Sequence, residues 1–166
     1  MQNELQEELV QTITSKLNLL GFVINLVAPA IILLIGYIVG RELHDLFTLE
    51  DDALTAIRWA LIGVSVAEIV IAFLIKRHLF SKLDKYFPEG TDLKAAVGLV
   101  VKMMVIIHVL AATPALYGLL YYILGGGIDG FLLMIILNLI GFQLCRARKS
   151  DFDSLSDIIQ KSLQSN

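Results

Sequence analysis

The sequence predicts an all-α, polytopic membrane protein whose four transmembrane helices form two like-oriented hairpins. Hydrophobic residues make up 57% of its 166 residues, and the mean hydropathy of +0.75 is far above that of an ordinary soluble domain. Several nearly uncharged runs reach the length of about 18 residues that spans a hydrocarbon core. Backbone polar groups in lipid must be satisfied within the chain, so each run should be helical.

The predicted spans cover about 19–40, 54–75, 95–124 and 128–145, which together form the transmembrane domain. The first hairpin closes through a polar connection, the second through the tight turn "GGGIDG". The longest polar connection joins the hairpins and ends in a turn at Pro88 and Gly90. The chain starts with acidic residues rather than a cationic segment, so the first span is expected to be retained and not cleaved as a signal peptide.

Amphipathic segments flank the spans at both ends. Residues 1–18 and the tail 146–166 each carry an apolar residue about every four positions, which is helical spacing. These stripes are Leu5, Leu9, Ile13 and Leu17 in the first segment, and Phe152, Leu155, Ile159 and Leu163 in the tail. Such stripes lie on the bilayer surface or on each other, or they dock a partner.

Lysine and arginine residues predict the orientation. Eleven of the thirteen cationic residues fall at the ends and connections that share a side with the termini, and Arg41 and Arg58 fall opposite. The positive-inside rule therefore places both termini and the central loop in the cytoplasm. The basic central loop is expected to contact anionic lipid headgroups.

One apolar phrase occurs twice. "VAPAIILLIGYIVGR" starts at Val27, and "ATPALYGLLYYILGG" starts at Ala112. Superposing them aligns Pro29 with Pro114, Tyr37 with Tyr122, and Gly40 with Gly125. The alignment favours an internal repeat produced by tandem duplication over chance coincidence in apolar helices. Each proline is expected to kink its span, since it removes one helix hydrogen bond.

Small residues recur on one face in three spans. They are Gly36 and Gly40 in the first, Ala60, Gly63 and Ala67 in the second, and Ala111, Ala115 and Gly118 in the third. Helices in lipid associate through such close-packing faces. The pattern is compatible with packing inside the monomer and with contact to a second chain.

Four polar residues lie at comparable depths within the spans: Glu68, Lys102, Asn25 and Asn138. They could form one polar layer inside the bundle, because an ionisable group in a span costs about 3 kcal/mol or more. Two alternatives remain open for Glu68, a functional carboxylate or a structural pair with Lys102. Lys102 could instead extend to the interface from a shorter span.

His108 is expected in the outer half of the third span, near Arg58, as a hydrogen-bonded packing residue. His44 and His78 lie in connections, so a haem held between two histidines is not indicated. The single cysteine, Cys145, excludes an internal disulfide and a thiolate metal cluster. With no nucleophile–base pair, metal motif or phosphate loop, no enzyme, cofactor or metal is predicted.

The tandem-hairpin layout resembles the duplicated proteolipid subunits of rotary ATPases, and "TPALYGLL" (Thr113 to Leu120) is similar to their proline-containing helix. That resemblance implies an ion-carrying carboxylate, but here Ala115 follows Pro114 and the motif's carboxylate has no counterpart. The "PALYG" stretch is also similar to small four-span bacterial membrane proteins, a resemblance that implies a bacterial inner membrane and no particular activity.

The sequence therefore favours a non-catalytic accessory or scaffold subunit of a larger membrane assembly. Its expected partners are the lipid bilayer and other membrane subunits or a second copy of itself, and no nucleic acid. The alternative is a small transporter or ion-translocating subunit that uses Glu68 as its intramembrane carboxylate.

Overall fold

The computed structural model describes residues 2–44, 49–82, 93–148 and 151, with side chains described for 11–38, 49–82, 97–148 and 151. Six helical segments follow one another: α1 (Gln2–Phe22), the π-helical η1 (Val23–Val27), α2 (Ala28–His44), α3 (Asp51–Ser81), α5 (Leu93–Ile123) and α6 (Ile128–Cys145). Throughout these ranges the chain is helical apart from turns, so the predicted all-α class is confirmed.

Within the described residues, four stretches are long and apolar enough to span a membrane, namely Gln11–Ile38, Asp51–Ser81, Val97–Ile123 and Ile128–Cys145. The fourth agrees with the predicted span, whereas the first begins earlier. The chain from α1 through η1 to α2 is one continuous helical run, so the boundary expected after residue 18 falls inside it. Ile13 and Leu17 are buried in the core, while the side chains of Leu5 and Leu9 and the tail stripe lie outside the described residues.

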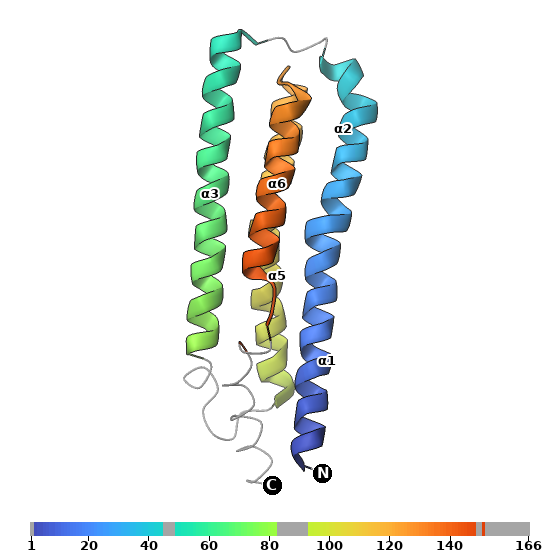
Figure 1. Ribbon diagram of the computed structural model, residues 1–166, viewed down its shortest axis with the longest axis vertical. Helices are drawn as coiled ribbons and strands as arrows, with labels where there is room; N and C mark the ends of the chain where they lie inside the picture. The colour runs from blue at the N-terminus through green and yellow to red at the C-terminus, as the bar shows by residue number, and fades with distance from the viewer. Residues whose placement is uncertain (1, 45–48, 83–92, 149–150, 152–166) are drawn as a thin grey trace.

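The central helix of the bundle is α5, which packs against α1, η1, α2, α3 and α6. The helices run alternately up and down. The connection between α2 and α3 and the turn between α5 and α6 lie at the same end of the bundle (Figure 1). In that view α2 and α3 lie on either side of the α5–α6 pair. The two helices of the first hairpin therefore lie on opposite sides of the second hairpin. Most of the packing between helices involves α5.

The turn between α5 and α6 is closed by glycines. Gly125 has a φ of 97°, and the N–H groups of Gly126 and Gly125 donate to the carbonyls of Tyr121 (3.0 Å) and Tyr122 (3.2 Å). This is the Schellman pattern, in which a left-handed glycine satisfies the last helix carbonyls. A Cβ on Gly126 or Gly130 would overlap the Tyr121 ring. The predicted tight turn is present and lets the two helices approach closely.

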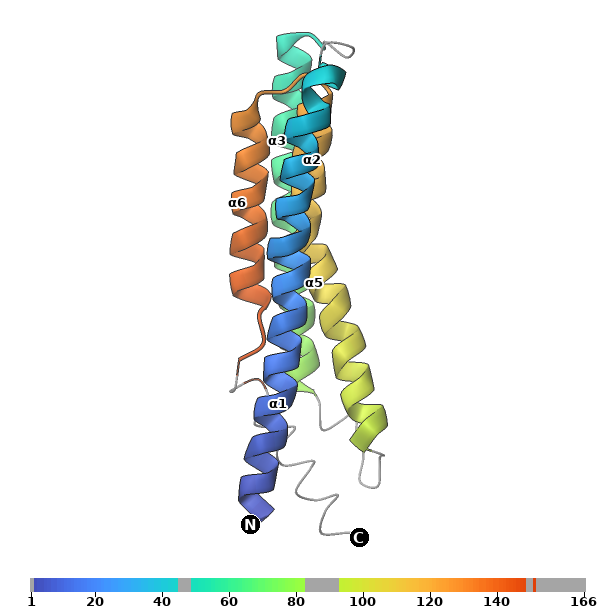
Figure 2. The same cartoon turned by 90° about the vertical axis from the view of Figure 1, so that its right-hand side faces the viewer.

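The two aligned prolines sit in different local structures. Pro29 follows the π-helical turn η1, whereas Pro114 lies inside α5, which is α-helical over Leu93–Ile123. Partway along its length α5 bends, and its lower part diverges from the bundle (Figure 2). The two hairpins also pack differently, since α5 and α6 lie together and α2 and α3 lie apart. The internal repeat stays a prediction from the sequence.

Two of the three small-residue faces point into the bundle. A Cβ on Gly36 would lie 2.7 Å from the Phe131 ring, and one on Gly118 would lie 2.8 Å from Cβ of Met134. Ala111 and Ala115 are fully buried. On these faces the small residues serve packing within the monomer. The burial of Gly40, the other small residue of the first face, is not among the described features.

Candidate functional site

Three polar side chains meet in the middle of the bundle and are fully buried: Asn25, His108 and Asn138. They come from η1, α5 and α6 respectively, and we call them the central polar cluster. Two of them belong to the predicted polar layer, and His108 joins them from outside it. Buried polar groups must find partners inside the protein, so the hydrogen bonds of this cluster determine how three helices meet.

Pro29 accounts for one of these bonds. In an α-helix the N–H of residue 29 would donate to the carbonyl of Asn25, four residues earlier, but proline has no N–H. The side-chain amide of Asn138 donates to that Asn25 carbonyl at 2.7 Å. Thus α6 supplies the donor that the proline cannot. A proline in the first span is thus linked to a polar residue in the fourth.

The side-chain amide of Asn25 makes the other bonds of the cluster. Its Nδ2 donates to the carbonyl of Gly21 at 3.0 Å and contacts Nδ1 of His108 at 3.2 Å. When Nδ1 accepts this bond, the ring proton of the neutral imidazole is on Nε2. Gly21 makes room for the ring, because a Cβ there would lie 2.6 Å from the Cε1 and Nε2 atoms of His108.

Three buried atoms of the cluster have no partner among the described residues: Nε2 of His108 and the Oδ1 atoms of Asn25 and Asn138. In the tautomer above, the first is a donor and the other two are acceptors. The ring of His108 packs at a tilt on Phe142, with ring centroids 6.0 Å apart. The cluster has the chemistry of a structural hydrogen-bond network, since no carboxylate or cation takes part in its bonds.

Glu68 and Lys102 lie outside this cluster. The hydroxyl of Tyr117, on α5, donates to Oε1 of Glu68 at 2.7 Å. The other carboxyl oxygen, Oε2, is buried and has no partner among the described residues. Lys102 has an exposed side chain, so the structure does not pair it with Glu68. Depth along a helix predicts the level of a side chain, but each residue turns by about 100°, so residues at one level can face different neighbours.

The expected position of His108 near Arg58 is wrong. His108 lies against Gly21 and Phe142, whereas Arg58 pairs with Asp129 of the α5–α6 turn region at 3.2 Å. The third helix starts at Leu93, which places residue 108 at its midpoint, and helical side chains lean toward the N-terminus. That lean moves the imidazole toward the end of the bundle where α1 begins, which we call the inner end.

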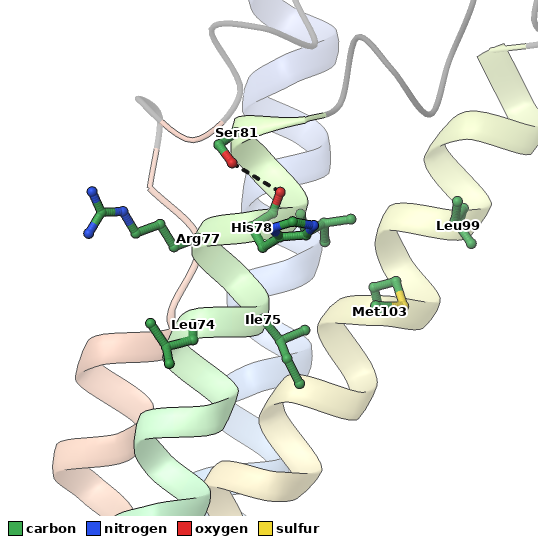
Figure 3. A pocket seen from close by; sticks show the side chains of 8 residues that line it. Leu74, Ile75, Arg77, His78, Ser81, Leu99 and Met103 are labelled. Atoms are coloured by element: carbon green, nitrogen blue, oxygen red, sulfur yellow. Dashed lines mark hydrogen bonds between the residues drawn. The ribbon is translucent and has the colours of Figure 1, made fainter.

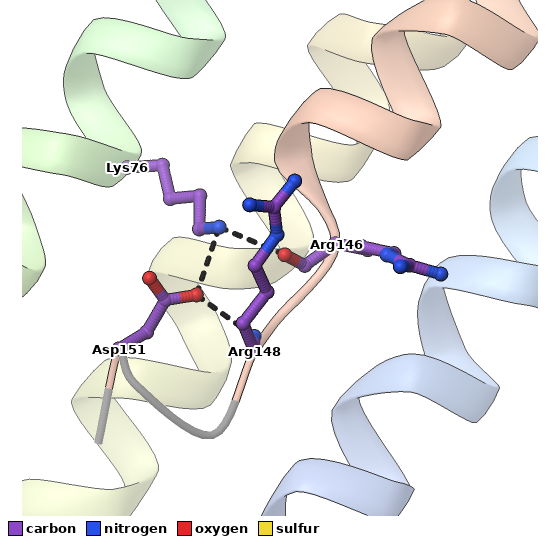
Figure 4. Close-up of polar contacts among 4 residues, drawn as sticks. All are labelled: Lys76, Arg146, Arg148 and Asp151. Atoms are coloured by element: carbon purple, nitrogen blue, oxygen red, sulfur yellow. Dashed lines mark hydrogen bonds and ion pairs between the residues drawn. The ribbon is translucent and has the colours of Figure 1, made fainter. Parts of the chain in front are cut away.

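A second polar network lies at the inner end and was not anticipated from the sequence. Nζ of Lys76 is 2.8 Å from Oδ2 of Asp151 and donates to the Arg146 carbonyl at 2.8 Å. The backbone N–H of Arg148 donates to the same carboxylate oxygen at 2.8 Å (Figure 4). Lys76 occurs in "IKRH", where a lysine is expected to extend to the interface. Its partner follows α6 far along the chain, so no local signal revealed the pair.

Hollows lie on two sides of the inner end of α3, as far as the described residues show. The larger, about 740 Å³, is mainly apolar and separates α3 from the divergent part of α5 (Figure 3). Its lining is Leu74, Ile75, Arg77, His78, Leu79, Ser81, Leu99 and Met103. The smaller, about 350 Å³, lies on the α6 side and is lined by Phe73, Lys76, Arg77, Phe80, Ser81, Leu144, Arg148 and Asp151. Although Arg77 lines both, its side chain points away from α5 (Figure 3).

Within the part of the chain that the structure describes, no group of three or more His, Cys, Asp or Glu side chains is placed to hold a metal ion. Comparison of the chain with protein-family models, curated proteins and solved structures returns no match.

Proposed function

We propose that this chain is a small integral membrane protein that acts as a non-catalytic accessory or scaffold subunit, bound through α3 to another membrane subunit or to a second copy of itself. The observation that carries the proposal is the outward face of α3. Ala56, Ala60, Gly63 and Ala67 are all exposed, whereas Gly36 of α2 and Ala111, Ala115 and Gly118 of α5 are buried. They recur at heptad spacing and so lie along one stripe.

An exposed stripe of small residues suits a neighbouring helix better than lipid. At a lipid-facing position a leucine is as well accommodated as an alanine. A close helix–helix contact, in contrast, requires small residues. Many exposed positions of the other helices are large, as in Ile31, Leu34 and Ile38 of α2. On α3 the stripe is flanked by larger exposed residues, including Trp59 and Val64. A second helix could approach α3 closely along this stripe.

Replacing Gly63 by leucine should weaken association by roughly tenfold or more, about 1.4 kcal/mol, because the side chain would hold the partner helix away. The monomer should fold normally, since a Cβ at Gly63 meets nothing within 4 Å. The measurement is the amount of each co-purified membrane subunit, by quantitative mass spectrometry in mild detergent, together with self-association by energy transfer between labelled copies.

Gly98 provides a matched control, because a Cβ there also meets nothing within 4 Å and it lies on a different helix, α5. Gly98→Leu should leave association unchanged. Equal retention of every associated chain by the Gly63→Leu and Gly98→Leu variants would contradict the proposed role of α3.

We further propose that the chain resides in a bacterial inner membrane, as the similarity of its "PALYG" stretch implies, with the inner end in the cytoplasm, as the lysine and arginine distribution implies. A cysteine in place of Ser81 should resist an impermeant thiol reagent in intact cells, and a cysteine in place of Glu50 should react. Labelling at position 81 without permeabilisation would reverse the orientation. Cys145 is buried and gives little background.

A second candidate function, ion or proton translocation, is favoured by the surroundings of Glu68. Its carboxyl group is held by Tyr117 within an apolar span and keeps one buried oxygen unpartnered among the described residues. A carboxyl group kept in a span at a cost of about 3 kcal/mol suggests a use beyond packing.

Under this second proposal, Glu68 should react with a hydrophobic carbodiimide, and the transported ion should block that reaction. Glu68→Gln should then abolish ion flux in reconstituted vesicles while association through α3 persists. Asp129→Asn serves as the control, since that carboxylate is exposed outside the interior of the bundle. Full activity of the Glu68→Gln variant in every assay of the assembly would leave the accessory role as the better account.

A further inference from the structure

The smaller hollow, between the inner ends of α3 and α6, carries an excess of positive charge. Lys76, Arg77 and Arg148 line it together with a single carboxylate, Asp151. That carboxylate is engaged by Lys76 at 2.8 Å and by the backbone N–H of Arg148 at 2.8 Å. The guanidinium groups of Arg77 and Arg148 are therefore the cations of this hollow that no described carboxylate neutralises.

The network around Lys76 keeps the floor of the hollow in place. The Lys76 side chain is 7% exposed, and its ammonium is held by the Arg146 carbonyl as well as by Asp151. Such a buried, hydrogen-bonded pair does not reorient at low cost. Lys76 thus positions the segment after α6, and the two arginines are left for a ligand.

The hollow has an apolar wall beside its cationic end. Phe73 and Leu144 line it and are 37% and 40% exposed. Phe73 precedes Arg77 by four residues and Leu144 precedes Arg148 by four, and both apolar residues lie toward the middle of the bundle, since α3 and α6 both end here. A volume of about 350 Å³ is within the range of small-ligand pockets. A ligand that fits has an anionic head and an apolar tail.

We infer that this hollow binds an anionic phospholipid, with its phosphate on Arg77 and Arg148 and an acyl chain along Phe73 and Leu144. Arginine presents several donors in a planar fork that matches phosphate oxygens. Basic pockets between helix ends at headgroup level recognise such lipids. The apolar wall distinguishes a lipid from a soluble phosphate, which would gain nothing from it. This inference does not depend on the role of α3 or of Glu68.

Native mass spectrometry of the delipidated full-length protein can test the inference, with phosphatidylglycerol and phosphatidylcholine of identical acyl chains as probes. Phosphatidylglycerol should bind roughly tenfold more tightly. The Arg77→Gln/Arg148→Gln variant should lose most of that preference. Both side chains are exposed, so the variant should keep the thermal unfolding temperature of the unmodified protein.

Arg146→Gln is the matched control. Arg146 lies between Leu144 and Arg148 in sequence, but its side chain extends away from Lys76 and Asp151 (Figure 4), and only its backbone carbonyl contacts Lys76. This variant should retain the preference for phosphatidylglycerol. An equal loss in the Arg146→Gln variant would show a general charge effect and overturn the site. Displacement of the lipid by millimolar inorganic phosphate would show a soluble-anion site and overturn the lipid assignment.

Discussion

Replacing Asp151 by alanine should lower the free energy of unfolding by about 3–5 kcal/mol, because it strands a buried ammonium. The side chains of Lys76 and Asp151 are 7% and 20% exposed, and their charged atoms are 2.8 Å apart. Without the carboxylate, Lys76 keeps the Arg146 carbonyl but no counter-charge. Chemical unfolding in detergent, followed by circular dichroism, measures the loss.

The ion pair at the opposite end of α3 provides the control. Arg58 on α3 and Asp129 on α6 have charged atoms 3.2 Å apart, but their side chains are 34% and 68% exposed. Solvent-exposed pairs contribute about 0–1 kcal/mol, so Asp129→Ala should cost little. Lys76→Met combined with Asp151→Ala should recover most of the stability, since the stranded charge is removed. Equal, small losses in both single variants would contradict the buried-pair account.

The sequence was sufficient to predict the number of spans and the turn of the second hairpin. Length and hydropathy identify a span without reference to its neighbours, and the run of glycines before Ile128 is a local turn signal. The stagger and bend of helices are set by packing between them. The sequence predicts a flanking segment followed by a separate span at the start of the chain. Packing instead leaves α1 and α2 as one continuous helical run through η1.

The candidate polar layer was predicted only in part, since depth is readable from sequence and direction is not. Asn25 and Asn138 do meet, but Glu68 faces Tyr117 and Lys102 is exposed. The stripe that includes Ala60 and Gly63 shows the same limit. Small residues mark a close-packing face, and only the arrangement of the other helices tells whether that face is inside or outside the bundle.

One relation within the polar cluster was present in the sequence. Asn25 precedes Pro29 by four residues, the spacing at which a proline fails to donate to a helix carbonyl. A carbonyl without its usual donor in lipid needs another donor. The sequence could not show that Asn138 supplies it, because that choice depends on how α6 packs against η1.

This relation yields the last prediction, that the need for Asn138 depends on Pro29. Asn138→Ala should cost about 1–3 kcal/mol of stability, because it removes the donor to the buried Asn25 carbonyl, 2.7 Å away. In a Pro29→Ala background, residue 29 regains an N–H that can donate to this carbonyl, so the cost of Asn138→Ala should fall by about 1 kcal/mol. The cavity left by the asparagine is the same in both backgrounds and cancels in the double-mutant cycle. Unfolding free energies of the four proteins complete the test. Strictly additive losses would mean that Asn138 and Pro29 contribute independently, which would overturn the proposed link between them.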